Sequence, residues 1–192
     1  AAFAGAAALV QVSYQRDALG RITRKTETLG GQTDVFDYHY DLAGRLDEVF
    51  ANGISISQYV YDANGNRTGG YNGQGAITAS YDAQDRLLSY SGKTYTYTAN
   101  GELLTKTENG ATTTFDYEEL GNLLQVVLPG NVTVDYLIDG QNRRIGKKLN
   151  GVLTQGFLYQ DQLKPVAELD GSGNVTSRFV YADKLNVPSY MI

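Results

Sequence analysis

Aromatic residues stand two positions apart in short stretches along the chain, often with threonine or another polar residue between them. A period of two is typical of a β-strand with one aromatic face. No stretch shows a capped 3.6-residue period longer than about two helical turns, so we expect almost no helix. The aromatic stretches contain Phe36, Tyr38, Tyr40; Tyr59, Tyr61; Tyr95, Tyr97; Phe115, Tyr117; Phe157, Tyr159; Phe179 and Tyr181.

The same turn follows many of these stretches. A tyrosine and an aspartate lead into a glycine, and an apolar residue then opens a return strand. The aspartate can accept backbone N–H bonds in the turn, and the glycine suits a positive φ. Asp85 and Asn142 occupy the glycine position, which both residue types tolerate. We expect an architectural role for Tyr40, Asp41, Gly44, Arg45, Tyr61, Asp62, Gly65, Tyr81, Asp82, Arg86, Tyr97, Gly101, Tyr117 and Gly121.

A second class of turn ends each return strand. Asn-Gly between alternating strands is a strong hairpin signal, and other pairs containing glycine fill equivalent places. The copies follow one another at intervals of about 20 residues, too short for tetratricopeptide, ankyrin or propeller units. These turns are Asn52-Gly53, Asn72-Gly73, Asn109-Gly110 and Asn150-Gly151, with Gly30-Gly31, Ser91-Gly92 and Pro129-Gly130-Asn131 as variants.

The alternation of the two turns predicts an all-β fold. A single hairpin is not stable alone, so successive hairpins are expected to stack into one continuous, coiled antiparallel ribbon. Rings of adjacent strands are expected in register on one face. We expect an N-terminal segment of unclear role at 1–13, about eight to nine repeat units over 14–185, and a truncated end at 186–192.

Composition excludes several classes of function. Lys and Arg number 16 against 21 Asp and Glu, a net charge of −5, which disfavours nucleic-acid binding. The absence of cysteine excludes disulfides and thiolate chemistry. No apolar run reaches the roughly 18–20 residues of a membrane helix, so we expect no membrane insertion by this segment.

Neither a catalytic nor a metal site is expected. His39 is the only histidine and lies between two tyrosines, on the opposite strand face, with no GxSxG motif in the chain. A calcium ladder along Asp41, Asp62, Asp82, Asp139 and Asp170 is a minor alternative to turn chemistry. The stretch 62–66 loosely matches the start of an EF-hand loop, but Gly73 stands where the loop needs a bidentate Glu.

Other candidate chemistry has simpler structural interpretations. The glycine-rich stretch 69–75 lacks the Lys-Ser/Thr of a phosphate loop. The adjacent pairs Asp47-Glu48 and Glu118-Glu119 face opposite sides of a strand, which excludes a paired-carboxylate site. We expect no cofactor, and carbohydrate binding by exposed tyrosines stays open as an alternative. A solvated strand face is the expected role of the basic cluster Arg143, Arg144, Lys147 and Lys148.

The copies that begin at Tyr40, Tyr61 and Tyr81 resemble the YD-repeat, or Rhs-repeat, family over roughly 14–185. Members include bacterial polymorphic toxins, shell-forming components of Tc toxin complexes and animal teneurins. The resemblance implies that the ribbon is a segment of a hollow shell or barrel. In bacterial members such a shell surrounds a C-terminal toxin, and in teneurins it serves cell-surface recognition.

The resemblance therefore implies a non-catalytic structural segment in a secreted or surface-displayed bacterial protein. Its expected partners are the rest of its own shell and an enclosed toxin or effector domain. The alternative is a module that recognises a glycan or protein on a cell surface. The family's self-cleaving region carries DPxG-like motifs, and this chain has no Asp-Pro, its prolines being Pro129, Pro165 and Pro188. No protease activity is therefore assigned to any residue.

Overall fold

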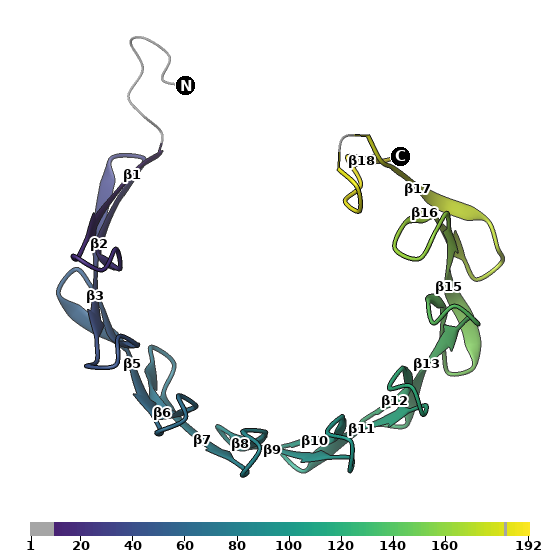
Figure 1. Cartoon of the computed structure of the whole chain (residues 1–192), viewed down its shortest axis with the longest axis horizontal. Helices are drawn as coiled ribbons and strands as arrows, with labels where there is room; N and C mark the ends of the chain where they lie inside the picture. The colour runs from purple at the N-terminus through teal and green to yellow at the C-terminus, as the bar shows by residue number, and fades with distance from the viewer. Residues whose placement is uncertain (1–9, 183) are drawn as a thin grey trace, which may run out of the picture. The chain divides into compact units, whose positions relative to one another are not determined.

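The computed structural model describes residues 10–182 and 184–192. Most of the predicted N-terminal segment 1–13 lies outside the described residues, and the first strand begins at Val10. Within the described ranges all regular secondary structure is β-strand, as expected (Figure 1). The chain divides into two compact units, Ala1–Ser91 and Gly92–Ile192, which are described separately.

Unit 1 is an antiparallel ribbon in which each strand pairs with the next strand along the chain. Because the connecting turns are short, each strand folds back and pairs antiparallel with the strand that follows it in the chain. Its strands are β1 (Val10–Arg16), β2 (Ile22–Leu29), β3 (Gln32–Tyr40), β4 (Leu46–Ala51), β5 (Ile54–Tyr61), β6 (Arg67–Asn72), β7 (Ala76–Tyr81) and β8 (Leu87–Tyr90).

Unit 2 repeats this arrangement, so the predicted ribbon of antiparallel hairpins is confirmed in each unit. Its strands are β9 (Lys93–Tyr97), β10 (Leu103–Glu108), β11 (Ala111–Tyr117), β12 (Leu123–Leu128), β13 (Val132–Ile138), β14 (Arg144–Leu149), β15 (Val152–Tyr159), β16 (Pro165–Asp170), β17 (Val175–Val180) and β18 (Tyr190–Met191).

The tyrosine-led turn has the backbone conformation that its residues predict. The Asp41 N–H donates to the Arg45 carbonyl at 2.8 Å, and the Gly44 N–H donates to the Asp41 carbonyl at 2.9 Å. The φ of Gly44 is +83°. Asp85 and Asn142 hold the same left-handed position at +61° and +64°, so their predicted place in the turn is confirmed.

A β-bulge accompanies the tyrosine-led turn. Tyr40 pairs with Leu46 while His39 pairs with Glu48, so Asp47 is an extra residue in the return strand. The same register shift stands beside the corresponding turns in both units. A bulge increases the local right-handed twist. The bulge was not predicted from the sequence, because no residue type marks the inserted position.

The Asn-Gly turns are two-residue turns with one exception. Asn52 and Gly53 have φ values of +50° and +80°, and Asn150 and Gly151 have +49° and +80°. The hairpin predicted at Asn72-Gly73 is present but has a longer loop, because Tyr71 pairs with Ala76 and leaves residues 72–75 between them. The two extra residues allow a wider loop, in which the Gly73 N–H donates to the Ile56 carbonyl at 2.8 Å.

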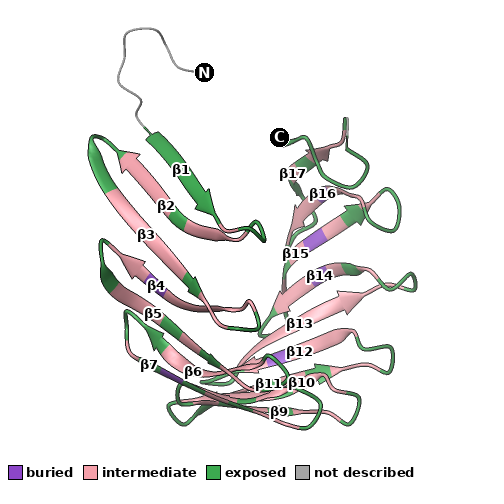
Figure 2. Cartoon of the chain, turned by 60° about the vertical axis from the view of Figure 1, so that its left-hand side comes forward, coloured by how far each residue is buried: buried purple, intermediate pink, exposed green. Residues whose placement is uncertain are grey.

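Neither unit buries a second layer against its sheet. Strand contacts in the described residues join only neighbours along the chain. The buried hydrophobic residues there are Val49, Ile77, Val126 and Ala167, and Figure 2 shows intermediate or exposed residues along most strands. Because few hydrophobic residues are buried, each ribbon depends for its stability on contacts between successive repeats.

Candidate functional site: the contacts between successive repeats

The aspartate of the turn binds the residue four positions later through both carboxylate oxygens. Asp41 Oδ1 accepts the Arg45 backbone N–H at 2.8 Å, and Asp41 Oδ2 accepts Arg45 Nε at 2.7 Å. The backbone bond is the Asx chemistry expected from the sequence. The side-chain bond adds a charge-assisted pair that fixes the direction of the guanidinium. The same two bonds occur in Asp17–Arg21, Asp82–Arg86 and Asp139–Arg143.

The guanidinium then covers the tyrosine that ends the next repeat. Arg45 lies 4.6 Å from the centre of the Tyr61 ring, within the range of cation–π attraction. Arg45 Nη1 also donates to the carbonyl of Asp62 at 3.0 Å. Equivalent stacking joins Arg21 to Tyr40 at 4.5 Å. An arginine of one turn is thereby fixed to the strand end and the turn of the next repeat.

The tyrosine completes the link in the opposite direction. The Tyr61 hydroxyl donates to the Leu46 carbonyl at 2.7 Å, in the return strand of the preceding repeat. Tyr40 and Tyr81 donate in the same way to the carbonyls of Ile22 and Arg67, at 2.7 and 3.1 Å. We call each set of aspartate, arginine and following tyrosine an inter-repeat clamp. Examples are Asp17–Arg21–Tyr40, Asp41–Arg45–Tyr61 and Asp139–Arg143–Tyr159.

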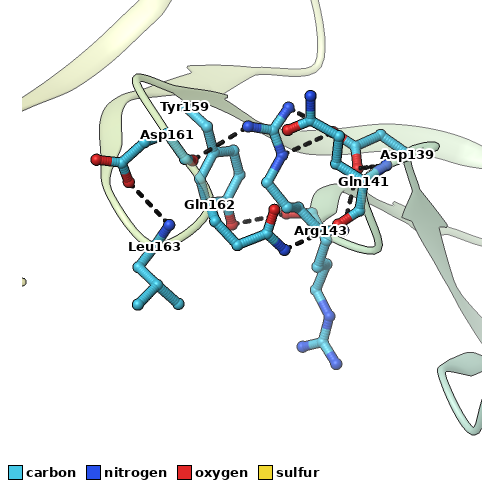
Figure 3. Close-up of polar contacts among 8 residues, drawn as sticks. Asp139, Gln141, Arg143, Tyr159, Asp161, Gln162 and Leu163 are labelled. Carbon is cyan, nitrogen blue, oxygen red and sulfur yellow. Dashed lines mark hydrogen bonds and ion pairs between the residues drawn. The ribbon is translucent and has the colours of Figure 1, made fainter.

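Figure 3 shows the clamp of unit 2. Arg143 points from the Asp139 carboxylate across the Tyr159 ring, 5.0 Å from its centre, and its Nη1 donates to the Asp161 carbonyl at 3.1 Å. The Tyr159 hydroxyl donates to the Arg144 carbonyl at 3.0 Å. Gln162 Nε2 adds a bond to the Gln141 carbonyl at 2.8 Å, which joins the two adjacent turns directly.

These contacts correct the expectation that the tyrosine rings stack on one another in register. The rings of Tyr40, Tyr61 and Tyr159 lie against guanidinium groups. A planar guanidinium fits between successive repeats and brings five donors to the carboxylate and carbonyl around it. The signal was present in the sequence, because an arginine directly follows the glycine in Gly20-Arg21 and Gly44-Arg45.

Some repeats replace part of the clamp. Asn66 takes the arginine place after Asp62 and donates to Asp62 Oδ2 at 3.1 Å and to Asp85 Oδ1 in the next turn at 2.6 Å. Gly65, Gly101 and Gly121 keep the positive φ of the turn. Tyr97 and Tyr117 end their strands by pairing with Leu103 and Leu123.

The turn carboxylates are stabilised in their ionised form. The backbone N–H of Arg45 is the first cause that lowers the pKa of Asp41, and the Arg45 side chain adds to it. The side-chain hydrogen bond from Arg143 lowers the pKa of Asp139. Hydrogen bonds to a charged carboxylate favour that form. The clamp is therefore fully charged at neutral pH.

The remaining candidate residues have structural partners. The His39 ring lies 5.0 Å from the Phe50 ring. Arg143 departs from the expected solvated face, because its side chain packs on Tyr159 and is 18% exposed. Arg144 stacks on Tyr136 and stays exposed. In residues 10–182 and 184–192, no three His, Asp or Glu side chains are grouped to hold a metal ion. Over the same ranges no helix has the length and hydropathy needed to cross a membrane.

Comparison with known proteins agrees with this repeat architecture. Teneurin-3 of Mus musculus is 30% identical over 159 residues, which cover 80% of this chain and 6% of that protein. The tRNA nuclease WapA of Bacillus subtilis (strain 168) is 29% identical over 172 residues, which cover 90% of this chain and 6% of that protein. The chain thus spans a small fraction of the curated relatives it matches.

The fold is shared with a solved structure. The crystal structure of TcdB2-TccC3 superposes with a TM-score of 0.51 and 14% identity, covering 90% of this chain and 14% of that one. The sequence profile of the Teneurin YD-shell family matches residues 3–191, almost the whole chain. With its tyrosine-led hairpins and a profile match of this extent, the chain belongs to the Teneurin YD-shell family.

Proposed function

We propose that this chain is a non-catalytic wall segment of a YD shell that surrounds or scaffolds a toxin or effector domain in a secreted or surface-displayed bacterial protein. The observation that carries the proposal is the inter-repeat clamp. Where it is complete, it links one repeat to the next in both chain directions, as a wall built from successive repeats requires. The polar groups of the clamp are occupied by one another, which leaves them no role in bond chemistry.

The partners of such a segment are the adjoining parts of the same shell and the enclosed domain. The small share of each relative that the chain covers, 6% of Teneurin-3, supports adjoining shell segments as partners. We place any nuclease or toxin activity of the parent outside this segment, since the matched part of WapA is 6% of that protein.

Protease protection in the full-length parent tests the proposal. The parent should shield one domain from proteinase K, and cutting that shield open should expose it. We expect Arg45→Ala combined with Arg143→Ala to lose protection, because both changes remove a guanidinium from a clamp. Leu42→Ala is the matched control, since Leu42 is fully exposed at a turn. A parent whose domains are all cleaved equally fast, with the wall intact, contradicts encapsulation.

The alternative is a recognition or carbohydrate-binding module. It is favoured by tyrosines that face solvent outside the clamps, at 54% exposure for Tyr14 and 39% for Tyr71. A ring of this kind can stack on a sugar face. Glycan-array binding that disappears in a folded Tyr71→Ala variant, while protease protection stays absent in the parent, selects this alternative.

A further inference from the structure

In unit 2, the turn 98–102 lacks the arginine of the clamp. In the turn 98–102, Thr98 and Glu102 occupy the places that Asp41 and Arg45 hold in unit 1. The Glu102 N–H still donates to Thr98 Oγ1 at 3.1 Å, and the Thr98 hydroxyl donates to Glu102 Oε2. The turn therefore keeps its backbone geometry, while the guanidinium of the clamp is replaced by a carboxylate.

Glu102 follows the path that an arginine takes in the other unit. A Cβ placed on Gly44 would lie 3.1 Å from Arg21 Nη1, and a Cβ placed on the equivalent Gly121 would lie 3.7 Å from Glu102 Oε1. Both side chains thus point from one turn to the glycine of the next turn. Because glutamate is shorter than arginine and opposite in charge, the space above the next tyrosine is left without a cation.

A cavity of about 220 Å³ lies at this place. Its lining includes Thr98, Glu102, Phe115, Tyr117, Glu118 and Glu119, and no lysine or arginine. The volume is several times the roughly 30 Å³ that one water occupies in the liquid. It has room for a guanidinium group and the methylene groups next to it.

Tyr117 is the tyrosine that such a group would cover. The Tyr40 and Tyr61 hydroxyls donate to carbonyls of the preceding repeat, whereas the Tyr117 hydroxyl has no hydrogen-bond partner within residues 10–182 and 184–192. Burial, followed by the charge of Glu102, raises the pKa of Tyr117. The hydrogen bond from Thr98 lowers the pKa of Glu102, so a carboxylate faces this ring at neutral pH.

We propose that this cavity binds the guanidinium group of an arginine side chain supplied by another polypeptide segment. The guanidinium lies over the Tyr117 ring and donates to the Glu102 carboxylate, as Arg45 lies over Tyr61 and donates to a carboxylate of its own turn. The clamps at Tyr40, Tyr61 and Tyr159 show the ligand chemistry that these positions accommodate. The inference does not depend on whether the shell encloses a cargo.

Arginine is favoured over other cations by the shape of the site. A planar guanidinium can stack on a ring and pair with a carboxylate at its edge at the same time. The compact ammonium of lysine satisfies one of these contacts at a time. We therefore expect an arginine peptide to bind at least tenfold more tightly than its lysine counterpart, and its neutral citrulline counterpart to bind least.

Titration of the purified chain with acetyl-Ala-Arg-Ala-amide tests the site, with ¹⁵N–¹H NMR as the readout. We expect saturable shifts confined to residues 98–121. The lysine and citrulline tripeptides are run in parallel. Equal binding of the citrulline peptide overturns the proposal, because it shows that the charge of the ligand does not matter. Shifts spread over other repeats overturn it as well, because they show that the ligand does not select the turn that lacks the arginine.

Two variants localise the binding to the missing clamp. Glu102→Gln keeps the side-chain size and should lower the affinity for the arginine peptide at least tenfold. Glu27→Gln removes the same charge in unit 1 and should leave that affinity unchanged. Thr98→Asp with Glu102→Arg rebuilds the clamp and should abolish binding while raising the melting temperature. If Glu102→Gln fails to fold, the variant with the rebuilt clamp provides the test. Undiminished binding of the arginine peptide to that variant contradicts the proposed site.

Discussion

At the residue scale, the turn aspartate combines two functions that its short side chain can perform together. Asp41 caps the Arg45 backbone N–H with one oxygen and orients the Arg45 side chain with the other. Both partners lie four residues away, so the arrangement forms within one turn. The aspartate therefore serves the local fold and the contact to the next repeat at once.

Gly44 provides a direct test of the turn at this scale. Its φ of +83° lies in the left-handed region, where a residue with a Cβ is strained. Gly44→Ala should therefore lower the free energy of unfolding by about 1 kcal/mol or more. Gly140→Ala is the matched control, because that glycine lacks a positive φ and has open space around it. Equal urea midpoints for the two variants would show that the turn tolerates a side chain.

At the scale of the hairpin, stability depends on bonds between neighbouring elements. Asn52, in the turn between β4 and β5, makes two hydrogen bonds to Val35 of β3. Its N–H donates to the Val35 carbonyl at 2.8 Å, and its Oδ1 accepts the Val35 N–H at 2.9 Å. Asn150 binds Thr133 in the same way. The side-chain oxygen of the asparagine accepts a backbone N–H bond as a strand carbonyl would. This bond is a second reason for asparagine at this position, besides its tolerance of a positive φ.

The Asn52 contact predicts unequal effects of one substitution at two similar turns. Asn52→Gly keeps the turn conformation but leaves the Val35 N–H without its acceptor, and should cost about 1 kcal/mol in the free energy of unfolding. Asn109→Gly should cost less, since the Asn109 side chain makes no hydrogen bond within the described ranges. Denaturant unfolding measures both, and identical losses would contradict the side-chain role of Asn52.

The hydroxyl of the clamp tyrosine can be tested without disturbing the stacking. Tyr61→Phe keeps the ring beneath Arg45 and removes the bond to the Leu46 carbonyl. We expect the free energy of unfolding to fall by about 1 kcal/mol. Tyr71→Phe, at an exposed ring outside the clamps, serves as the control and should be within about 0.5 kcal/mol of the parent.

At the scale of the whole molecule, the repeated carboxylates add up to a dependence on pH. The pKa is lowered in the folded state for the turn aspartates Asp17, Asp41, Asp62, Asp82, Asp139, Asp161 and Asp170. A lowered folded-state pKa gives stability that is present above the unfolded value of about 3.9 and is lost as pH falls through the folded value.

The melting temperature should therefore stay nearly constant from pH 7 to about pH 5 and fall steeply below about pH 4. Thermal unfolding at a series of pH values, followed by far-ultraviolet circular dichroism, measures this profile. The Asp41→Asn variant should show a shallower acid fall, because one of the titrating carboxylates is gone. A main loss of stability between pH 7 and pH 5 would mean that groups other than these aspartates control it.

Much of the fold could be predicted from the chain alone, because its causes are local. Alternating rings predict strands through a two-residue period, and Asp, Gly and Asn at fixed offsets predict turns and positive φ. Each of these depends on residues at most four positions apart. The longer loop at Asn72-Gly73 also has a local cause, since Gln74 and Gly75 follow the leading pair before the next strand begins.

Only the tertiary structure decided which groups meet across repeats. Arg45 and Tyr61, or Glu102 and Tyr117, stand about 15 residues apart in sequence, and their contact depends on a bulge that no residue type marks. Inserting one residue into a strand redirects the side chains beyond it. The chain by itself therefore determined its strands, turns and repeat, while three-dimensional register determined which groups meet in the clamps.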